Sequence, residues 1–243
     1  METNDPFDIA AICAHPDDAE LGMGGTLALE AARGRRVALV DLTRGECGSR
    51  GTPETRAAEA AEAARILGVG HRECLNLPDA RLAPSPEQKD AVVAVVRRLR
   101  PRVVLLQYWE QRHPDHAAAS RLVYEACFLA GLRNYEPGLG APFRPLKLVY
   151  SLPMTEGPDI GPSFVVDVSS VWDTKMKAVR AYASQFTPGG GESVALPFDR
   201  FQQAVELAAR RQGQRIGVTY GEAFVTREPL QVQDLLALSV GSF

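Results

Sequence analysis

The chain has 243 residues, of which 45% are hydrophobic and 23% are charged, and its formal net charge is −3 at pH 7. This composition is ordinary for a globular protein, and it excludes intrinsic disorder, collagen-like repeats and a disulfide scaffold. The 30 acidic residues outnumber the 27 basic residues, so no excess of positive charge is present to bind nucleic acid phosphates. The apolar runs are too short to span a bilayer, and we therefore expect neither a nucleic acid nor a membrane partner.

The four cysteines are widely separated and form no C-x-x-C pair, which argues against a zinc knuckle or a redox motif. They are Cys13, Cys47, Cys74 and Cys127. The acidic N-terminus lacks the basic and apolar regions of a signal peptide. We therefore expect buried, reduced thiols and a cytoplasmic location.

The first 130 residues alternate between short apolar runs and longer helical patterns. Strands are predicted at residues 8–14, 36–42, 73–77 and 102–108, and helices at 20–33, 53–68, 86–100 and 115–130. Glycine follows or ends the first two helices, and proline begins the second. Strands that alternate with helices of this length predict an α/β fold with a mostly parallel, Rossmann-like sheet and helices on both faces.

Beyond residue 133, prolines and glycines interrupt this pattern. Further strands are predicted at 147–152 and 164–168, and helices at 171–182 and 198–212, with a glycine-rich loop at 187–192 between these helices. The sequence contains no internal repeat and no long linker. We therefore predict a single domain over residues 1–243, in which residues 134–243 complete a pocket on the core formed by residues 1–133.

A histidine and two aspartates, His15, Asp17 and Asp18, follow the first predicted strand. In open parallel sheets, ligands bind at the carboxyl ends of the strands. His15 and Asp18 are three positions apart across a strand-to-helix turn, so one nitrogen and one oxygen can converge on the same ion. The G-x-G-x-x-G fingerprint of a dinucleotide site is not present at this turn.

A second cluster, His113, Asp115 and His116, follows the strand predicted at 102–108. A single His-Pro-Asp turn is more often a helix cap or a turn device than a metal ligand. However, the two clusters lie at similar strand ends and together hold three of the four histidines in the chain. Their combination therefore favours a metal site.

His15, Asp18 and one of the two later histidines would supply two nitrogens and one oxygen. This is the ligand set of an open catalytic zinc centre that keeps one position for water, and Fe(II) is a chemical alternative. Asp17, adjacent to a ligand, would remain free to act as a general base at neutral pH.

Four segments of the chain resemble the zinc-dependent N-acetylglucosaminyl deacetylases (PIG-L/LmbE-like), which include enzymes of the phosphatidylinositol-glycan, mycothiol and bacillithiol pathways. The segments are residues 14–20 (AHPDDAE), 41–46 (DLTRGE), 55–60 (TRAAEA) and 112–116 (RHPDH). Residues 184–186 and 217–224 are similar to the bacillithiol branch in particular. The resemblance extends over nearly the whole chain.

The resemblance implies a role for each residue of the two clusters. It selects His116 as the third zinc ligand beside His15 and Asp18. It makes Asp17 the general base, and it gives His113, in protonated form, the task of stabilising the developing oxyanion.

Four further roles follow from the same resemblance. Asp115 would orient the ring of His113. Arg56 would hold the sugar, Asp79 would contact sugar hydroxyls, and Tyr220 is a further candidate for substrate contact.

The expected reaction is removal of acetate from an N-acetylglucosamine conjugate, with N-acetylglucosaminyl malate of bacillithiol synthesis as the expected substrate and other N-acetylated sugars as competitors. The resemblance also implies a homo-oligomer, such as a hexamer. The alternatives are a metal-dependent phosphoesterase and a non-catalytic protein that binds zinc or sugar. Asp17 and His113 argue against mere binding, because holding a metal would not require them.

Overall fold

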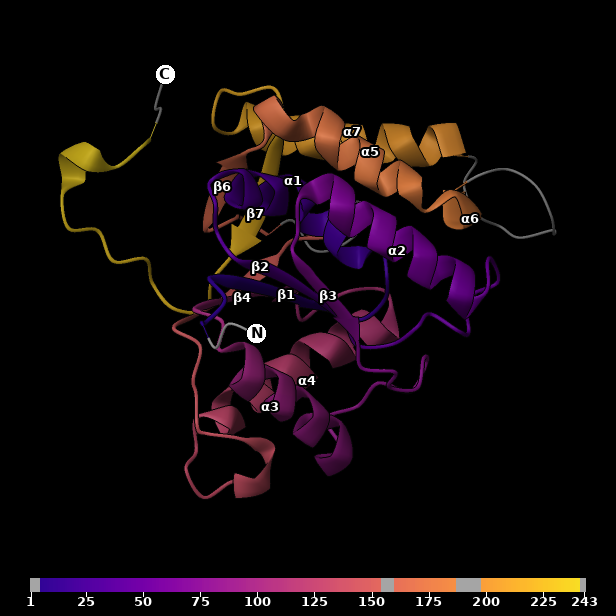
Figure 1. Ribbon diagram of the computed structural model, residues 1–243. Helices are drawn as coiled ribbons and strands as arrows, with labels where there is room; N and C mark the ends of the chain where they lie inside the picture. The colour runs from indigo at the N-terminus through magenta and orange to yellow at the C-terminus, as the bar shows by residue number, and fades with distance from the viewer. Residues whose placement is uncertain (1–4, 154–159, 187–197, 241–243) are drawn as a thin grey trace.

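The computed structural model describes residues 5–153, 160–186 and 198–240 (Figure 1). Seven strands form one sheet in the order β3-β2-β1-β4-β5-β7-β6. The strands are β1 (Ile9–Cys13), β2 (Val37–Asp41), β3 (His71–Cys74), β4 (Val103–Gln107), β5 (Lys147–Ser151), β6 (Phe164–Asp167) and β7 (Gly221–Val225). Strands β1 to β5 pair in parallel, whereas β7 pairs antiparallel with both β5 and β6. The predicted mostly parallel sheet is confirmed.

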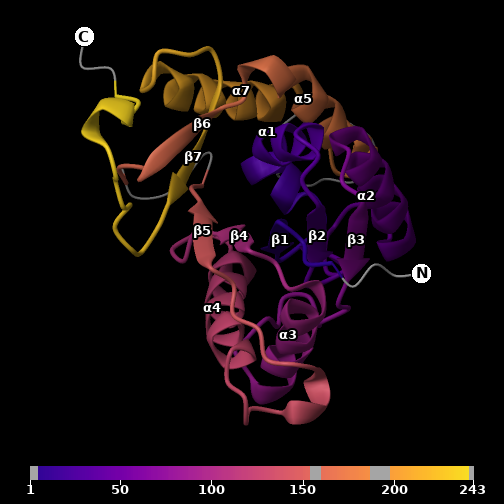
Figure 2. The same cartoon turned by 60° about the vertical axis from the view of Figure 1, so that its left-hand side comes forward.

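Helices cover both faces of the sheet, as predicted (Figures 1 and 2). The helices are α1 (Asp18–Ala32), α2 (Pro53–Leu67), α3 (Pro86–Leu99), α4 (Pro114–Ala130), α5 (Trp172–Ala181), α6 (Ala183–Phe186) and α7 (Phe198–Gln214). Helices α3 and α4 lie on one face, and α1, α2 and α5 lie on the other (Figure 2). Helix α7 packs against β7 at the antiparallel side of the sheet.

The central strands supply side chains to two hydrophobic cores, one on each face. Ile12 and Leu106 pack into the core beneath α3 and α4, while their neighbours Ala11 and Leu105 pack into the core beneath α1, α2 and α5. All five residues of β1 are buried. This burial on both faces explains why the strands read as continuous apolar runs rather than alternating patterns.

Strand β7 was not predicted, because its short sequence begins with a glycine and a carboxylate, Gly221 and Glu222. Glu222 is buried, and one of its oxygens lies 2.6 Å from Nζ of Lys175 on α5. The backbone N–H groups of Gly25 and Thr26 also donate to the Glu222 carboxylate, at 2.8 and 2.7 Å. A buried carboxylate is tolerated when it is paired and hydrogen-bonded in this way, but the partners come from distant parts of the chain.

The cysteines are all free, and their burial differs from the expectation. Cys13 and Cys127 are buried, Cys74 is half-buried and Cys47 is exposed. The prediction of four buried thiols is therefore wrong for Cys47, which lies in the loop after β2. The glycine-rich loop predicted at 187–192 lies outside the described residues. Among the described residues, no helix is long and apolar enough to cross a membrane.

Candidate active site

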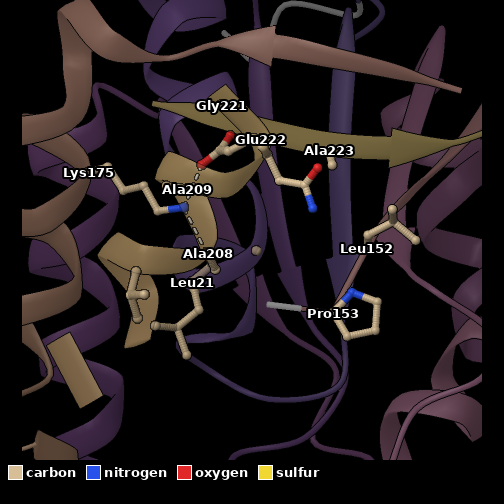
Figure 3. A pocket seen from close by; sticks show the side chains of 12 residues that line it. Leu21, Leu152, Pro153, Lys175, Ala208, Ala209, Gly221, Glu222 and Ala223 are labelled. Atoms are coloured by element: carbon tan, nitrogen blue, oxygen red, sulfur yellow. Dashed lines mark hydrogen bonds and ion pairs between the residues drawn. The ribbon is translucent and has the colours of Figure 1, made fainter. Parts of the chain in front are cut away.

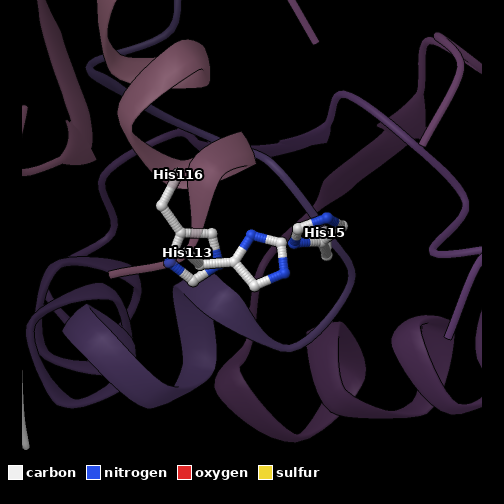
Figure 4. A group of neighbouring side chains, drawn as sticks. All are labelled: His15, His113 and His116. Atoms are coloured by element: carbon white, nitrogen blue, oxygen red, sulfur yellow. The ribbon is translucent and has the colours of Figure 1, made fainter. Parts of the chain in front are cut away.

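The two predicted clusters meet at one edge of the sheet. Strands β1 and β4 are parallel neighbours, so the loops at their carboxyl ends lie side by side. Figure 4 shows the rings of His15, His113 and His116 together at this position. The ring centroids lie 4.9 Å apart for His15 and His113, 5.4 Å for His15 and His116, and 4.6 Å for His113 and His116.

The carboxylate of Asp18 joins two of these rings. Its Oδ2 lies 3.3 Å from Nδ1 of His15, and its Oδ1 lies 3.1 Å from Nε2 of His116. The backbone N–H of His15 also donates to Oδ2 of Asp18, at 2.8 Å, which fixes the carboxylate across the turn. His15, Asp18 and His116, which were predicted as the metal ligands, therefore face one another.

The opposite nitrogen of His15 faces two other carboxylates. Nε2 of His15 lies 3.1 Å from Oδ1 of Asp79 and 3.4 Å from Oδ2 of Asp115. An imidazole that binds a metal through one nitrogen commonly donates the other N–H to a carboxylate. The contacts with Asp79 and Asp115 therefore favour the tautomer of His15 whose Nδ1 lone pair faces Asp18.

His116 is oriented in the same manner by an amide. Nδ1 of His116 lies 2.9 Å from Oε1 of Gln111, so the ring can donate this N–H and leave its Nε2 lone pair directed at Asp18. Sequence reasoning missed Gln111, although it lies only two residues before His113 in the loop after β4. In chemical kind, the two nitrogens of His15 and His116 and the carboxylate oxygens of Asp18 suit a divalent cation.

His15 belongs to two groups of side chains that could hold a metal, one with His113 and His116 and a second with Asp79 and Asp115. The two carboxylates of this group already accept hydrogen bonds from backbone N–H groups. Cys47 donates to Asp79 at 2.8 Å, and Ala80 donates to Asp115 at 2.7 Å. The side of His15 that faces Asp18 differs in that it also offers a second imidazole nitrogen, from His116.

The charges of the site shift the pKa values of His15 and Asp18, which contact each other. Burial lowers the pKa of His15, but the hydrogen bond and charge of Asp18, together with the charges of Asp79 and Asp17, outweigh burial and raise this pKa to about 9. Burial favours the neutral acid at Asp18, yet His116 and His15 hold the pKa of Asp18 well below its usual range. The surrounding negative charge that stabilises a proton on His15 would equally attract a metal cation.

Asp17 precedes helix α1 in a left-handed backbone conformation, with φ of 102°. Its Oδ2 lies 3.3 Å from Nη2 of Arg56. Burial and the charge of Asp18 raise the pKa of Asp17 to about 7, against the opposing effects of Arg56 and His15. A carboxylate with a pKa close to neutrality is suited to accept and return a proton.

His113 caps the N-terminus of helix α4. The backbone N–H of Asp115 donates to Nδ1 of His113 at 3.2 Å, so the proton of the neutral ring lies on Nε2. Burial and the positive charges of His116 and His15 lower the pKa of His113, which favours this neutral form over the protonated ring expected from the sequence. The predicted orientation of His113 by Asp115 thus comes from the backbone of Asp115, while its carboxylate lies against His15 and Ala80.

A cleft of about 600 Å³ opens beside the histidines. Asp18, His113 and His116 line one part of it, and apolar side chains that include Leu152, Pro153 and Phe201 line another. Gln107, which sequence reasoning also missed, lines the cleft and accepts a hydrogen bond of 3.0 Å from the backbone of Ala14.

A much smaller cavity of about 30 Å³ lies next to the cleft and shares Leu21 and Pro153 with it (Figure 3). Its polar lining is dominated by the ion pair of Lys175 and Glu222, drawn in Figure 3. The volume suits a water molecule and not a sugar. The cleft lined by Asp18, His113 and His116 is therefore the candidate substrate site.

The three residues predicted to contact the substrate differ in how near they lie to the histidine cluster. Arg56, Asp79 and Tyr220 are not among the side chains that line the cleft. The Tyr220 ring stacks on Trp172 at 4.1 Å, and its hydroxyl group lies 2.8 Å from Nη2 of Arg210. The structure therefore does not bring Tyr220 to the histidine cluster, whereas Arg56 and Asp79 contact Asp17 and His15.

The fold and site define an α/β protein with a candidate metal centre at the carboxyl ends of its parallel strands. A family model described as PIG-L, GlcNAc-PI de-N-acetylase, matches residues 10–127. A diacetylchitobiose deacetylase of Thermococcus kodakarensis is 32% identical over 206 residues, which cover 76% of this chain and 74% of the relative. The chain therefore belongs to the PIG-L family of de-N-acetylases.

Two further similarities extend this finding. The crystal structure of the conserved protein TT1542 from Thermus thermophilus is 43% identical, with a TM-score of 0.83, and the match covers 94% of this chain and 98% of that one. A 4-oxalmesaconate hydratase of Pseudomonas putida is 28% identical over 72% of each chain. Deacetylation is thus the activity named for the family model and the archaeal relative, and hydration is named for a third protein.

Proposed function

We propose that this protein is a metal-dependent N-deacetylase that removes acetate from an N-acetylglucosamine conjugate. The observation that carries the proposal is the convergence of two imidazole nitrogens on the two oxygens of Asp18, at 3.3 and 3.1 Å, with Asp17 beside them. Family membership supports the reaction class. Metal binding alone would not require Asp17 and His113.

The proposed ligands are His15, Asp18 and His116, and the proposed metal is zinc, with Fe(II) as the second choice. Two imidazole nitrogens and one carboxylate oxygen suit both ions. When bound, the ion would polarise the acetamide carbonyl group and lower the pKa of an attacking water molecule.

The remaining steps belong to side chains of this protein. Asp17 would accept a proton from the attacking water, whose oxygen forms a bond to the acetyl carbon. Nε2–H of His113 would donate a hydrogen bond to the oxyanion that develops on the carbonyl oxygen. When the C–N bond breaks, the proton held by Asp17 would pass to the departing amine, giving acetate and a free amino sugar.

We propose N-acetylglucosaminyl malate as the substrate, with N,N'-diacetylchitobiose as the main competitor. Support for malate comes from the similarity of residues 184–186 and 217–224 to the bacillithiol branch and from Arg112, a cation on the cleft wall. Support for chitobiose comes from the name of the archaeal relative. A single domain, a homo-oligomer such as a hexamer and a cytoplasmic location stay predictions.

Acetate release from N-acetylglucosaminyl malate, N,N'-diacetylchitobiose and free N-acetylglucosamine, with and without a chelator, tests the proposal. We expect release that the chelator abolishes and that added zinc restores, with the malate conjugate turned over fastest. Absence of chelator-sensitive release from all three would contradict deacetylation. An unsaturated dicarboxylate assayed in parallel would detect the hydration named for the Pseudomonas relative.

A further inference from the structure

The guanidinium group of Arg227 lies over three aromatic rings that belong to three different parts of the fold. Its central carbon is 4.6 Å from the ring centroid of Trp109, 4.3 Å from that of Tyr124 and 5.3 Å from that of Tyr150. Trp109 lies in the loop after β4, Tyr124 on α4 and Tyr150 on β5. A guanidinium group within about 6 Å of an aromatic centroid is attracted by the face of the ring. Arg227 therefore joins this loop, this helix and this strand.

The segment after β7 brings Arg227 to these rings. Val225, the last residue of β7, pairs with Tyr150 and packs into the core beneath α3 and α4. Arg227 follows two residues later, and its guanidinium group reaches Tyr124 of α4. The antiparallel pairing of β7 thus places the C-terminal part of the described chain against the loop after β4.

Trp109 is the anchor of this loop. Within residues 109–112, it is the side chain that packs on the core beneath α3 and α4. Its ring meets that of Tyr150 edge-on, with the two centroids 4.8 Å apart. Gln111 lies two residues beyond Trp109, and its Oε1 lies 2.9 Å from Nδ1 of His116. A displacement of Trp109 would therefore move the side chain that orients a proposed metal ligand.

We propose that Arg227 is a positioning residue for the candidate metal centre. Its guanidinium group holds the ring of Trp109, and the loop that Trp109 anchors places Gln111 against His116 and His113 on the wall of the cleft. The effect on turnover rests on the proposed function, in which His113 faces the reacting carbonyl group. The effect on metal binding acts through Gln111 and does not depend on the reaction.

Zinc titration of Arg227→Met against a competing chelator tests the proposal directly. The substitution removes the cation and retains an unbranched side chain. Loss of a partner that orients a metal-binding histidine weakens metal affinity by about 10–100-fold, and we expect the lower end, about 10-fold, because Arg227 acts through the loop. Arg227→Lys keeps a cation that can lie over the rings, so it should recover most of the zinc affinity.

Turnover provides a second measurement on the same variant. A misplacement of about 1 Å can cost about 10²-fold in rate, so a partly displaced loop should lower kcat of Arg227→Met by about 10-fold. The assay uses N,N'-diacetylchitobiose or N-acetylglucosaminyl malate, whichever the wild type turns over faster, with saturating zinc. Arg227→Lys should recover most of this loss as well.

A double-mutant cycle tests whether Arg227 acts through Gln111. Gln111→Ala removes the contact with His116, so Arg227→Met should weaken zinc binding much less in the Gln111→Ala background than in the wild type. Equal fold-losses of zinc affinity in the two backgrounds would overturn the proposal.

Tryptophan fluorescence reports the loop without metal or substrate. The chain has two tryptophans, Trp109 and Trp172, and Trp172→Phe keeps an aromatic ring against Tyr220 while leaving Trp109 as the single emitter. In this background, Arg227→Met should shift the emission maximum of Trp109 and increase its quenching by acrylamide. Unchanged emission and quenching would contradict the hold of Arg227 on Trp109.

Arg36→Met is the matched control. The guanidinium group of Arg36 lies 4.6 Å from the ring centroid of Phe7, so the variant also loses a contact between a cation and a ring. Arg36 precedes β2, whose five residues separate it from the carboxyl ends of the strands by about 17 Å. Arg36→Met should leave zinc affinity, kcat per folded molecule and Trp109 quenching unchanged.

A purely structural role for Arg227 would give a different result. Folded Arg227→Met would then show a lower melting temperature with wild-type zinc affinity and kcat, and this outcome would overturn the proposal. If the wild type releases no acetate, the proposed function fails, while the zinc titration and the quenching of Trp109 still decide whether Arg227 positions the loop.

Discussion

The two halves of the sheet use buried polar groups in different ways. At the parallel side, the ends of β1 and β4 bring His15, Asp18 and His116 together, and Asp18 and His116 line an open cleft. At the antiparallel side, Glu222 is enclosed and saturated by Lys175 and two backbone N–H groups. Buried polar side chains that meet beside an open cleft can take part in chemistry. A buried carboxylate whose oxygens are all bonded within the protein contributes to stability instead.

Asp17→Asn should produce the largest effect on activity. The amide has nearly the same shape but cannot accept the proton, and general-base assistance is typically worth about 10²–10⁴-fold in rate. We expect kcat to fall by this factor while zinc content, measured by elemental analysis, stays at the wild-type level. Normal turnover by a metal-loaded Asp17→Asn protein would contradict the assignment of Asp17 as the general base.

Lys175→Met should produce the largest effect on stability. It leaves the buried Glu222 carboxylate without its cation, and breaking a buried pair from one side typically costs about 3–5 kcal/mol. Denaturant unfolding measures this cost, and kcat per folded molecule should remain unchanged. The double variant Lys175→Met with Glu222→Gln should recover much of the stability. A large loss of turnover in folded Lys175→Met would contradict a purely structural role for the ion pair of Lys175 and Glu222.

The stability of the protein stripped of metal should depend on pH through His15. Its pKa is raised from 6.5 to about 9 in the folded protein, so the proton stabilises the fold below pH 6.5, and this stability is lost as pH rises through about 9. From the size of the shift, up to about 3 kcal/mol is at stake. Melting temperatures in chelator at pH 6 and pH 9.5 should show a larger drop for the wild type than for His15→Gln. Equal drops would contradict the carboxylate environment assigned to His15.

Asp79→Ala should have the smallest of these effects. Removing a carboxylate that supports a metal-binding histidine typically weakens metal affinity by about 10–100-fold. Zinc titration against a competing chelator measures this change. Asp90→Ala is a suitable control, because Asp90 accepts a hydrogen bond of 2.6 Å from Tyr135 and not from the cluster. A raised KM with unchanged zinc affinity would instead support the sugar contact that the sequence predicted for Asp79.

Local sequence signals were sufficient for the parallel part of the fold. Apolar runs gave β1, β2 and β4, and the proline and glycine at the ends of α2 occupy the first helical turn and a left-handed C-cap at Gly68. The His-Asp clusters could be found because each lies in the loop that follows a strand. The neighbouring positions of β1 and β4 then bring the clusters together.

The contacts that the sequence did not predict join residues that are far apart in the chain. The burial of Glu222 in β7 depends on Lys175, 47 residues away, and no local pattern announces that pairing. The position of Arg56 behind Asp17 depends on the loop that contains Gly45, and the contact between Asp79 and His15 joins residues 64 positions apart. A motif identifies which residue types are present, but only the packing shows which atoms they touch.

The most direct test of the central claim is acetate release after metal removal and stoichiometric reconstitution. Wild-type protein treated with chelator should lose its activity on N-acetylated sugar conjugates and regain it at one zinc ion per chain. His116→Ala should not regain it, whereas His71→Ala, altered at the histidine outside both clusters, should. Activity that survives metal removal, or that His116→Ala recovers fully with one zinc ion, would contradict the assignment of His15, Asp18 and His116 as a catalytic metal centre.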